Sequence, residues 1–334
     1  MRRSVVTVLA VVVLGTLCFA AVVAAQQDAD RVLLRYRWTA GDELVWHVTS
    51  ETTGTVLNRD HTQDPPQESE VEIWSSATMP MTLVVEEVDA EGNGTIAFEL
   101  GVMEIDMEAG GQQQYIRMDP EARTMTINGE EAPVPEAMLA GLAEPFRLIL
   151  SPRGEVLDVM VPEDFQMATG LQGVNLGQWM QLSQRWQLSF PEEPVGEGHC
   201  WGGAMTIPLA GEGGPASDAV AVYRMAGREL AHGADCVRIE AMGALDFTEL
   251  PSGLAGPAAA ASNLETEIGS GHISMDGAFW FDPQAGQLVA TDATITMDMT
   301  QRTTGTVQTP EGEVEVDVET ILQGLVVETS VEPG

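Results

Sequence analysis

Apolar and polar residues alternate with a period of two along most of the chain. Between residues 294 and 300, Ile295, Met297 and Met299 alternate with polar side chains, and residues 313–319 alternate acids with valines. This period with one polar face predicts strands that cover a core on one side and face water on the other. We therefore expect a mainly β protein built from antiparallel sheets.

Two motifs in which glycine follows proline by two residues predict hairpin turns. Thr309–Gly312 (TPEG) joins the two segments just described, and Ser151–Gly154 (SPRG) has the same form in the first half. Proline fixes φ at the second turn position, and glycine accepts the left-handed conformation.

The apolar positions change parity within one stretch of the first half. Ile96 and Phe98 share one parity, whereas Ile105 and Met107 have the other, with Gly101 between them. A slip of one residue is typical of a β-bulge or a sharp bend. Bent strands favour curved antiparallel sheets, half-barrel or barrel-like, over flat ones.

Two segments have helical character, so we expect a few helices to cover the sheets. Residues 135–145 begin with proline and are rich in Ala, Leu and Met, and residues 175–188 place Trp179, Met180 and Trp186 near one face. Glycines in and before the second segment weaken it as a helix. It can therefore act as a lid over a ligand space; alternatively, its tryptophans are part of the core.

Short motifs recur in the same order along the chain. The pattern of glycine, four residues and tryptophan occurs at Gly41–Trp46 and again at Gly196–Trp201. An ancient duplication would explain the order, and repeated use of the same turns in an antiparallel protein is the alternative. The predicted organisation is a first β-rich half at 26–161, a helical connector at 162–190 and a second β-rich half at 191–334.

The first 25 residues have the order of charges and apolar residues of a secretory signal. Arg2 and Arg3 precede a long apolar run, and small residues precede Gln26. We expect cleavage before Gln26 and an exported protein, periplasmic or extracellular. An uncleaved membrane anchor is the alternative. Leu17 before Cys18 is a poor fit to a lipidation signal.

The chain is strongly acidic, with 51 acidic and 15 basic residues. Such a chain repels phosphate backbones and anionic headgroups. Nucleic acid is therefore excluded as a partner, as is strong binding to an anionic membrane surface, and no protein partner is indicated.

Cys200 and Cys236 are the only cysteines after Cys18. A pair in an exported protein favours a disulfide, and the parity of their apolar neighbours places both on the solvent side. An intervening strand at 218–226 would hold them too far apart for the bond unless the sheet curves or the strands follow another order. With that condition we expect a disulfide between Cys200 and Cys236.

The sequence contains none of the motifs that would indicate a catalytic, cofactor or metal site. It lacks the histidine spacings of zinc enzymes, phosphate-binding loops and dinucleotide fingerprints. Met79 with Met81, and Met297 with Met299, place thioethers on one strand face, as copper(I) prefers, but filling of the core explains them better.

Five segments, in order along the chain, resemble an uncharacterised family of exported bacterial proteins and lipoproteins. They are YRWTAGDELVW (36–46), VVEEVDAEGNGTIAFEL (84–100), FRLILSPRGEVLDV (146–159), FPEEPVGEGHCW (190–201) and FWFDPQAGQL (279–288). The pattern is also loosely similar to periplasmic lipoprotein carriers, which hold acyl chains in an apolar concavity. The resemblance implies a non-catalytic envelope protein that binds an apolar or lipid ligand. A structural or protein-interaction module is the alternative, and a hydrolase comes third.

Overall fold

The computed structural model describes residues 31–134, 145–160, 170–171, 174–175, 188–208, 216–250, 263–309 and 312–334. The expected signal segment lies outside these residues, as do Trp179, Met180, Trp186 and nearly all of both expected helices. The described part consists of strands and connections and contains no helix, so the covering helices are not seen there. None of its residues forms a helix with the length and hydropathy needed to cross a membrane. The prediction of a mainly antiparallel β protein is confirmed.

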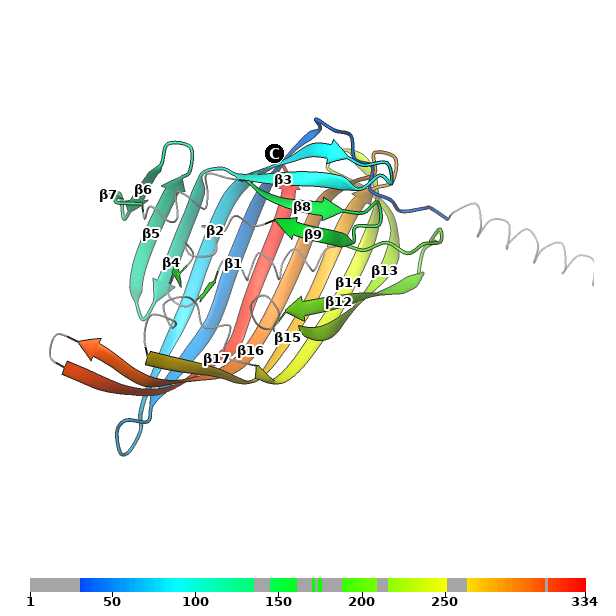
Figure 1. The fold of residues 1–334 in the computed structure, drawn as a ribbon. Coiled ribbons are helices and arrows are strands. Elements are labelled where there is room, and N and C mark those ends of the chain that lie inside the picture. Colours follow the sequence, from blue (N-terminus) through cyan, green and yellow to red (C-terminus); the bar gives the residue numbers. More distant parts are fainter. Residues whose placement is uncertain are drawn as a thin grey trace, which may run out of the picture.

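Fifteen strands form one large open sheet, which curves as Figure 1 shows. Its main path runs in the order β12-β13-β14-β15-β16-β17-β1-β2-β4-β5-β6-β7. The strands of this path are β1 (Glu43–Asp60), β2 (Gln67–Val88), β4 (Met103–Ala109), β5 (Gln112–Asp119), β6 (Thr124–Ile127), β7 (Glu130–Ala132), β12 (Cys200–Pro208), β13 (Ala216–Ala231), β14 (Ala234–Leu250), β15 (Asn263–Asp282), β16 (Gln287–Thr309) and β17 (Gly312–Pro333).

The last described strand, β17, pairs with the first described strand, β1, so the sheet continues from one half of the chain into the other. Thr52 of β1 lies opposite Val327 of β17 in an antiparallel register. The Gly41–Trp46 and Gly196–Trp201 motifs lead into β1 and β12, the first long strand of each half. The duplication itself stays a prediction.

A branch leaves the main sheet at the end of β2. The branch consists of β3 (Gly94–Leu100), β8 (Phe146–Leu150) and β9 (Val156–Met160). Two short strands outside the large sheet, β10 (Gly170–Leu171) and β11 (Val174–Asn175), pair with each other. β2 pairs with β4 up to Thr78 and with β3 from Met81 onward. The branch crosses the upper part of the sheet in Figure 1.

The chain bends at Gly101, where it passes from the branch back to the main sheet. The Gly101 amide donates a 2.8 Å hydrogen bond to the Pro80 carbonyl. A Cβ on Gly101 would lie 2.6 Å from the Pro80 ring, so only glycine fits without movement. The bend predicted beside Gly101 is confirmed, and so is the SPRG hairpin, which joins β8 to β9.

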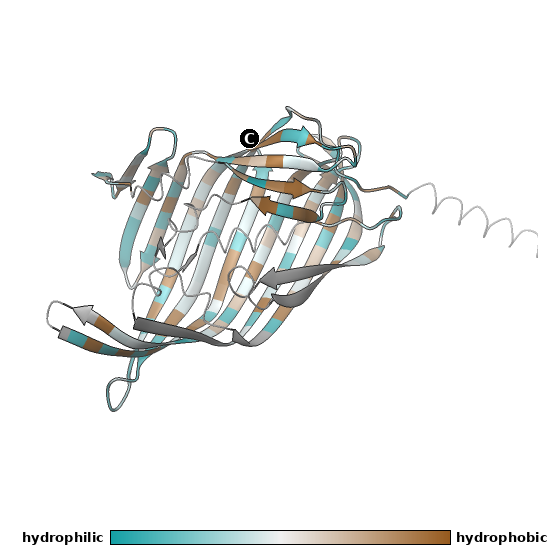
Figure 2. Ribbon diagram, in the orientation of Figure 1, coloured by the Kyte–Doolittle hydropathy of each residue, from teal (hydrophilic) through white to brown (hydrophobic). Residues whose placement is uncertain are grey.

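Two buried clusters lie on one side of the sheet, which we call the inner face. The first cluster joins β13–β15 to segments 32–38 and 188–195, and the second joins β2 to the branch. Figure 2 shows hydrophobic residues concentrated in β8 and β9 of the branch. Trp38 packs against both clusters, so the branch and the main sheet share one continuous core.

Aromatic rings hold the N-terminal segment against the sheet. Tyr36 stacks on Trp38 with centroids 4.9 Å apart and meets the edge of Phe281 at 5.3 Å. Phe190 contacts both Tyr36 and Phe281. Burial raises the pKa of Tyr36 far above its usual range, so its phenol stays neutral in the folded protein.

Candidate ligand-binding face

The inner face is continuous because neighbouring strands place their inward side chains at the same level. One row runs from β4 to β15 and consists of Met107, Ser75, Thr52, Val327, Ile295 and Met275. The next row contains Leu325, Met297 and Ile273. Alternation directs every second residue of each strand to this face, so the two halves of the chain build one surface.

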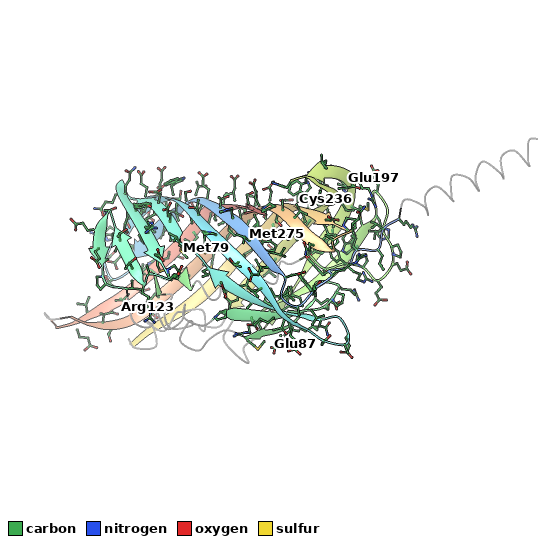
Figure 3. All side chains as sticks on the ribbon, turned by 90° about the horizontal axis from the view of Figure 1, so that it is seen from above. Met79, Glu87, Arg123, Glu197, Cys236 and Met275 are labelled. Carbon is green, nitrogen blue, oxygen red and sulfur yellow. The ribbon has the colours of Figure 1, made fainter. Side chains whose placement is uncertain are left out.

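Methionine is the characteristic residue of the inner face. Register and parity direct most of the described methionines to it: Met79, Met81, Met103, Met107, Met118, Met125, Met225, Met275, Met297 and Met299. Figure 3 labels Met79 of β2 and Met275 of β15. Unbranched thioether side chains adapt to irregular apolar partners. The face can therefore fit more than one apolar shape.

The middle of this face is only half-buried, unlike its covered parts. Met275 is 2 % exposed within the first cluster, whereas Met297 and Met299, which pack against the same cluster, are half-buried. Trp46 and Met81 border the second cluster in the same way. Large apolar side chains thus keep surface open to solvent between the two clusters.

The inner face carries no charged side chain within the described spans 44–58, 69–83, 221–225, 237–245, 271–281, 291–301 and 320–333. The polar groups that it does present are hydroxyls and amides, such as those of Ser50, Thr52 and Gln301. The absence of charge gives this face an environment of low polarity, in a chain with 51 acidic residues.

The outer face has the opposite character, with threonines and ion pairs. Arg302 donates two 2.8 Å hydrogen bonds to Asp317, which lower the pKa of that carboxyl. Arg59 bridges Glu68 at 2.9 Å and Glu319 at 3.2 Å. The sheet therefore separates an outer face with ion pairs and a few exposed apolar side chains, such as Trp74, Val222 and Met242, from an inner face without charge in the spans given above.

Cys200 and Cys236 are free thiols in the structure, and the expected disulfide is not formed. Cys200 lies opposite Arg224, which lies opposite Glu240, four residues beyond Cys236 on β14. Two strand spacings and four residues place the two cysteines roughly 16 Å apart, whereas a disulfide needs Cα atoms within about 7 Å. Cys200 is exposed as expected, but Cys236, at the end of β14 in Figure 3, is buried.

The described residues contain no group of three or more His, Cys, Asp or Glu side chains that could hold a metal ion. His272 hydrogen-bonds Asp246 at 2.6 Å, but parity places both on the outer face. The inner face thus offers hydrophobic contact and neutral hydrogen bonds, and its described part offers no acid–base pair.

Sequence reasoning found the inward methionines at 79, 81, 297 and 299 by their parity, but it assigned them to a filled core. It did not find that they share one surface. That depends on the pairing of β17 with β1, which joins residues far apart in the sequence.

No protein family model matches the chain, and no curated protein matches it. Among solved structures, lipovitellin, described for its lipid–protein interactions, has 8% identity and a TM-score of 0.40; the match covers 89% of this chain and 25% of lipovitellin. The chain thus spans only a quarter of lipovitellin. The outer membrane protein OprG from Pseudomonas aeruginosa has 7% identity and a TM-score of 0.25, covering 89% and 98%.

A putative outer membrane lipoprotein-sorting protein domain from Vibrio parahaemolyticus has 10% identity and a TM-score of 0.12, with 83% of this chain and 84% of that domain covered. The expected family of exported proteins stays a prediction. None of these likenesses carries an argument about function.

Proposed function

We propose that this chain is an exported, non-catalytic envelope protein that binds an apolar ligand, such as a lipid, on the inner face of its sheet. The observation that carries the proposal is the half-buried methionine surface between the two core clusters. Apolar side chains that stay partly open to water are unfavourable there, and a contiguous group of them is a common mark of a binding site.

The proposed role of the connector is to cover this surface. The described chain resumes at Leu188, which is buried in the first cluster beside the inner face. A lid made of Trp179, Met180 and Trp186 would therefore start close to the ligand.

Titration with Nile red, a neutral apolar dye, tests the proposal. Met297→Gln places an amide on the inner face, and Met242→Gln makes the same change on the outer face, where Met242 is 60% exposed. We expect Met297→Gln to weaken dye binding about tenfold, because a buried amide without a partner is unfavourable. Met242→Gln should bind as the wild type does. Equal binding by all three proteins would contradict the proposal.

A protein-interaction module remains the second candidate, because of the strand at one end of the sheet. Strand β12 (Cys200–Pro208) ends the strand order and carries no charged residue. Edge strands without charges are open to pairing with another chain. Oligomer formation that Thr206→Lys abolishes, together with an absence of dye binding, would favour this candidate.

A further inference from the structure

We infer that the ligand of the inner face is an electrically neutral apolar molecule, such as a neutral lipid or an ester, and not a fatty-acid anion or an anionic phospholipid. The inference rests on the proposed function, and it specifies the class of ligand that the same face accepts. The inference depends on which face of the sheet each charged side chain lies on.

Within the spans given above, the inner face lacks a positive partner for an anion. Five described arginines lie on the outer face (Arg59, Arg117, Arg224, Arg238, Arg302), and six lie in the branch, turns and loops (Arg31, Arg35, Arg37, Arg123, Arg147, Arg153). Arg228 lies on the inner side, opposite Val237 near the end of β13, and it already forms an ion pair with Asp235 at 3.4 Å. Several are already engaged, as Arg147 is with Glu86 and Arg35 is with the carbonyls of Pro191 and Glu192. A carboxylate or phosphate that left water for this face would lose hydration without a compensating ion pair.

The net negative charge of the whole protein also disfavours an anionic ligand. The chain has a net charge of −36, and the outer face of the same strands carries Glu51, Glu328 and Asp292. Summed over the surface, this charge lowers the local concentration of anions near the protein. An anionic ligand is therefore disfavoured both on approach and when bound.

The polar groups of the face fit a neutral ligand. Ser50, Thr52 and Ser75 lie side by side on β1 and β2, among the apolar residues. Hydroxyl groups donate and accept hydrogen bonds without a net charge. They match the ester carbonyl or hydroxyl of a neutral lipid, whereas a carboxylate would need stronger, charge-assisted partners.

The test compares a long-chain fatty acid with its methyl ester, because the two share the acyl chain and differ only at the head, which is a carboxylate in one and a neutral methyl ester in the other. Each displaces Nile red from the wild-type mature protein, residues 26–334, at mildly alkaline pH and below the concentration at which the acid forms micelles. We expect the ester to displace the dye at a concentration at least about tenfold lower than the acid does. An acid that competes as well as its ester, or better, would overturn the inference and leave the proposed function intact. If the dye does not bind at all, the proposed function fails, and the inference fails with it.

A charge placed on the inner face should change the preference. Met299→Arg puts a cation on the half-buried part of the face, and Met242→Arg makes the matched change on the outer face. We expect the ratio of ester to acid affinity to fall at least about fivefold in Met299→Arg only, because the guanidinium then pairs with the carboxylate. An unchanged ratio in a folded Met299→Arg protein would contradict the inference. If that variant does not fold, the wild-type comparison decides alone.

Discussion

Gly154 lies directly against the backbone of Leu188, although the two residues belong to different segments of the chain. A Cβ on Gly154 would lie 2.2 Å from the Leu188 carbonyl oxygen and 2.8 Å from the ring of Tyr36. Gly154 also has a φ of +78°, which favours glycine. This contact holds the turn between β8 and β9 against the end of the connector and against the aromatic core.

We therefore expect Gly154→Ala to destabilise the protein by about 3 kcal/mol or more, because steric overlap adds to backbone strain. Gly129→Ala is the matched control, since Gly129 has a φ of +82° and nothing within 4 Å of its Cβ position. The control should lose only about 1–2 kcal/mol. Urea unfolding measures both losses, and equal losses would show that the contact with Leu188 does not matter.

The ion pair between Glu86 and Arg147 should make stability depend on pH. Two hydrogen bonds from Arg147, of 2.7 and 3.0 Å, lower the pKa of Glu86. A lowered carboxyl pKa stabilises the fold above the ordinary value of 4.5, and this contribution is lost as the pH falls through the folded pKa. The pair is partly exposed, so its contribution is about 0.5–1 kcal/mol.

Glu86→Gln tests this dependence, because it removes the charge and keeps the shape. At neutral pH the variant should unfold at a lower urea concentration than the wild type. The difference should shrink as the pH falls below the ordinary glutamate value. A difference that stays constant across that range would contradict the assignment.

The two cysteines should react separately with a thiol reagent. Cys200 is exposed, whereas Cys236 is buried and has its pKa raised by that burial. In the native protein we expect one thiol to react fast and the other slowly, and Cys200→Ser should remove the fast phase. After denaturation without reductant, both should react. A protein with no reactive thiol under those conditions would restore the predicted disulfide.

A substitution of Trp179 distinguishes between two roles for this residue, as part of a lid over the ligand or as part of the protein core. Trp179→Ala should reduce retention of Nile red and leave the urea midpoint nearly unchanged. If Trp179 is a core residue instead, the same change should cost about 3–5 kcal/mol and leave dye binding as it was. Both measurements are made on the same variant.

Local features of the fold could be predicted from the sequence because each depends on a few neighbouring residues. Alternation predicted the strand faces in β16 and β17, and the parity slip predicted the bend at Gly101. The pairing of β17 with β1 has no local signal, and neither does the pairing of β3 with β8. The parity of its neighbours correctly placed Cys236 on the outer side of the sheet. It could not show that other residues bury Cys236 on that side.

The central claim is that the inner face holds a neutral apolar ligand, and organic extraction tests it most directly. The protein is purified without detergent from the cells that produce it and extracted with organic solvent, and the extract is analysed by mass spectrometry. The account predicts neutral lipid at close to one molecule per chain or more in the wild type, and much less in Met297→Gln. An extract that contains no lipid, from a folded protein that also fails to bind Nile red, would contradict it.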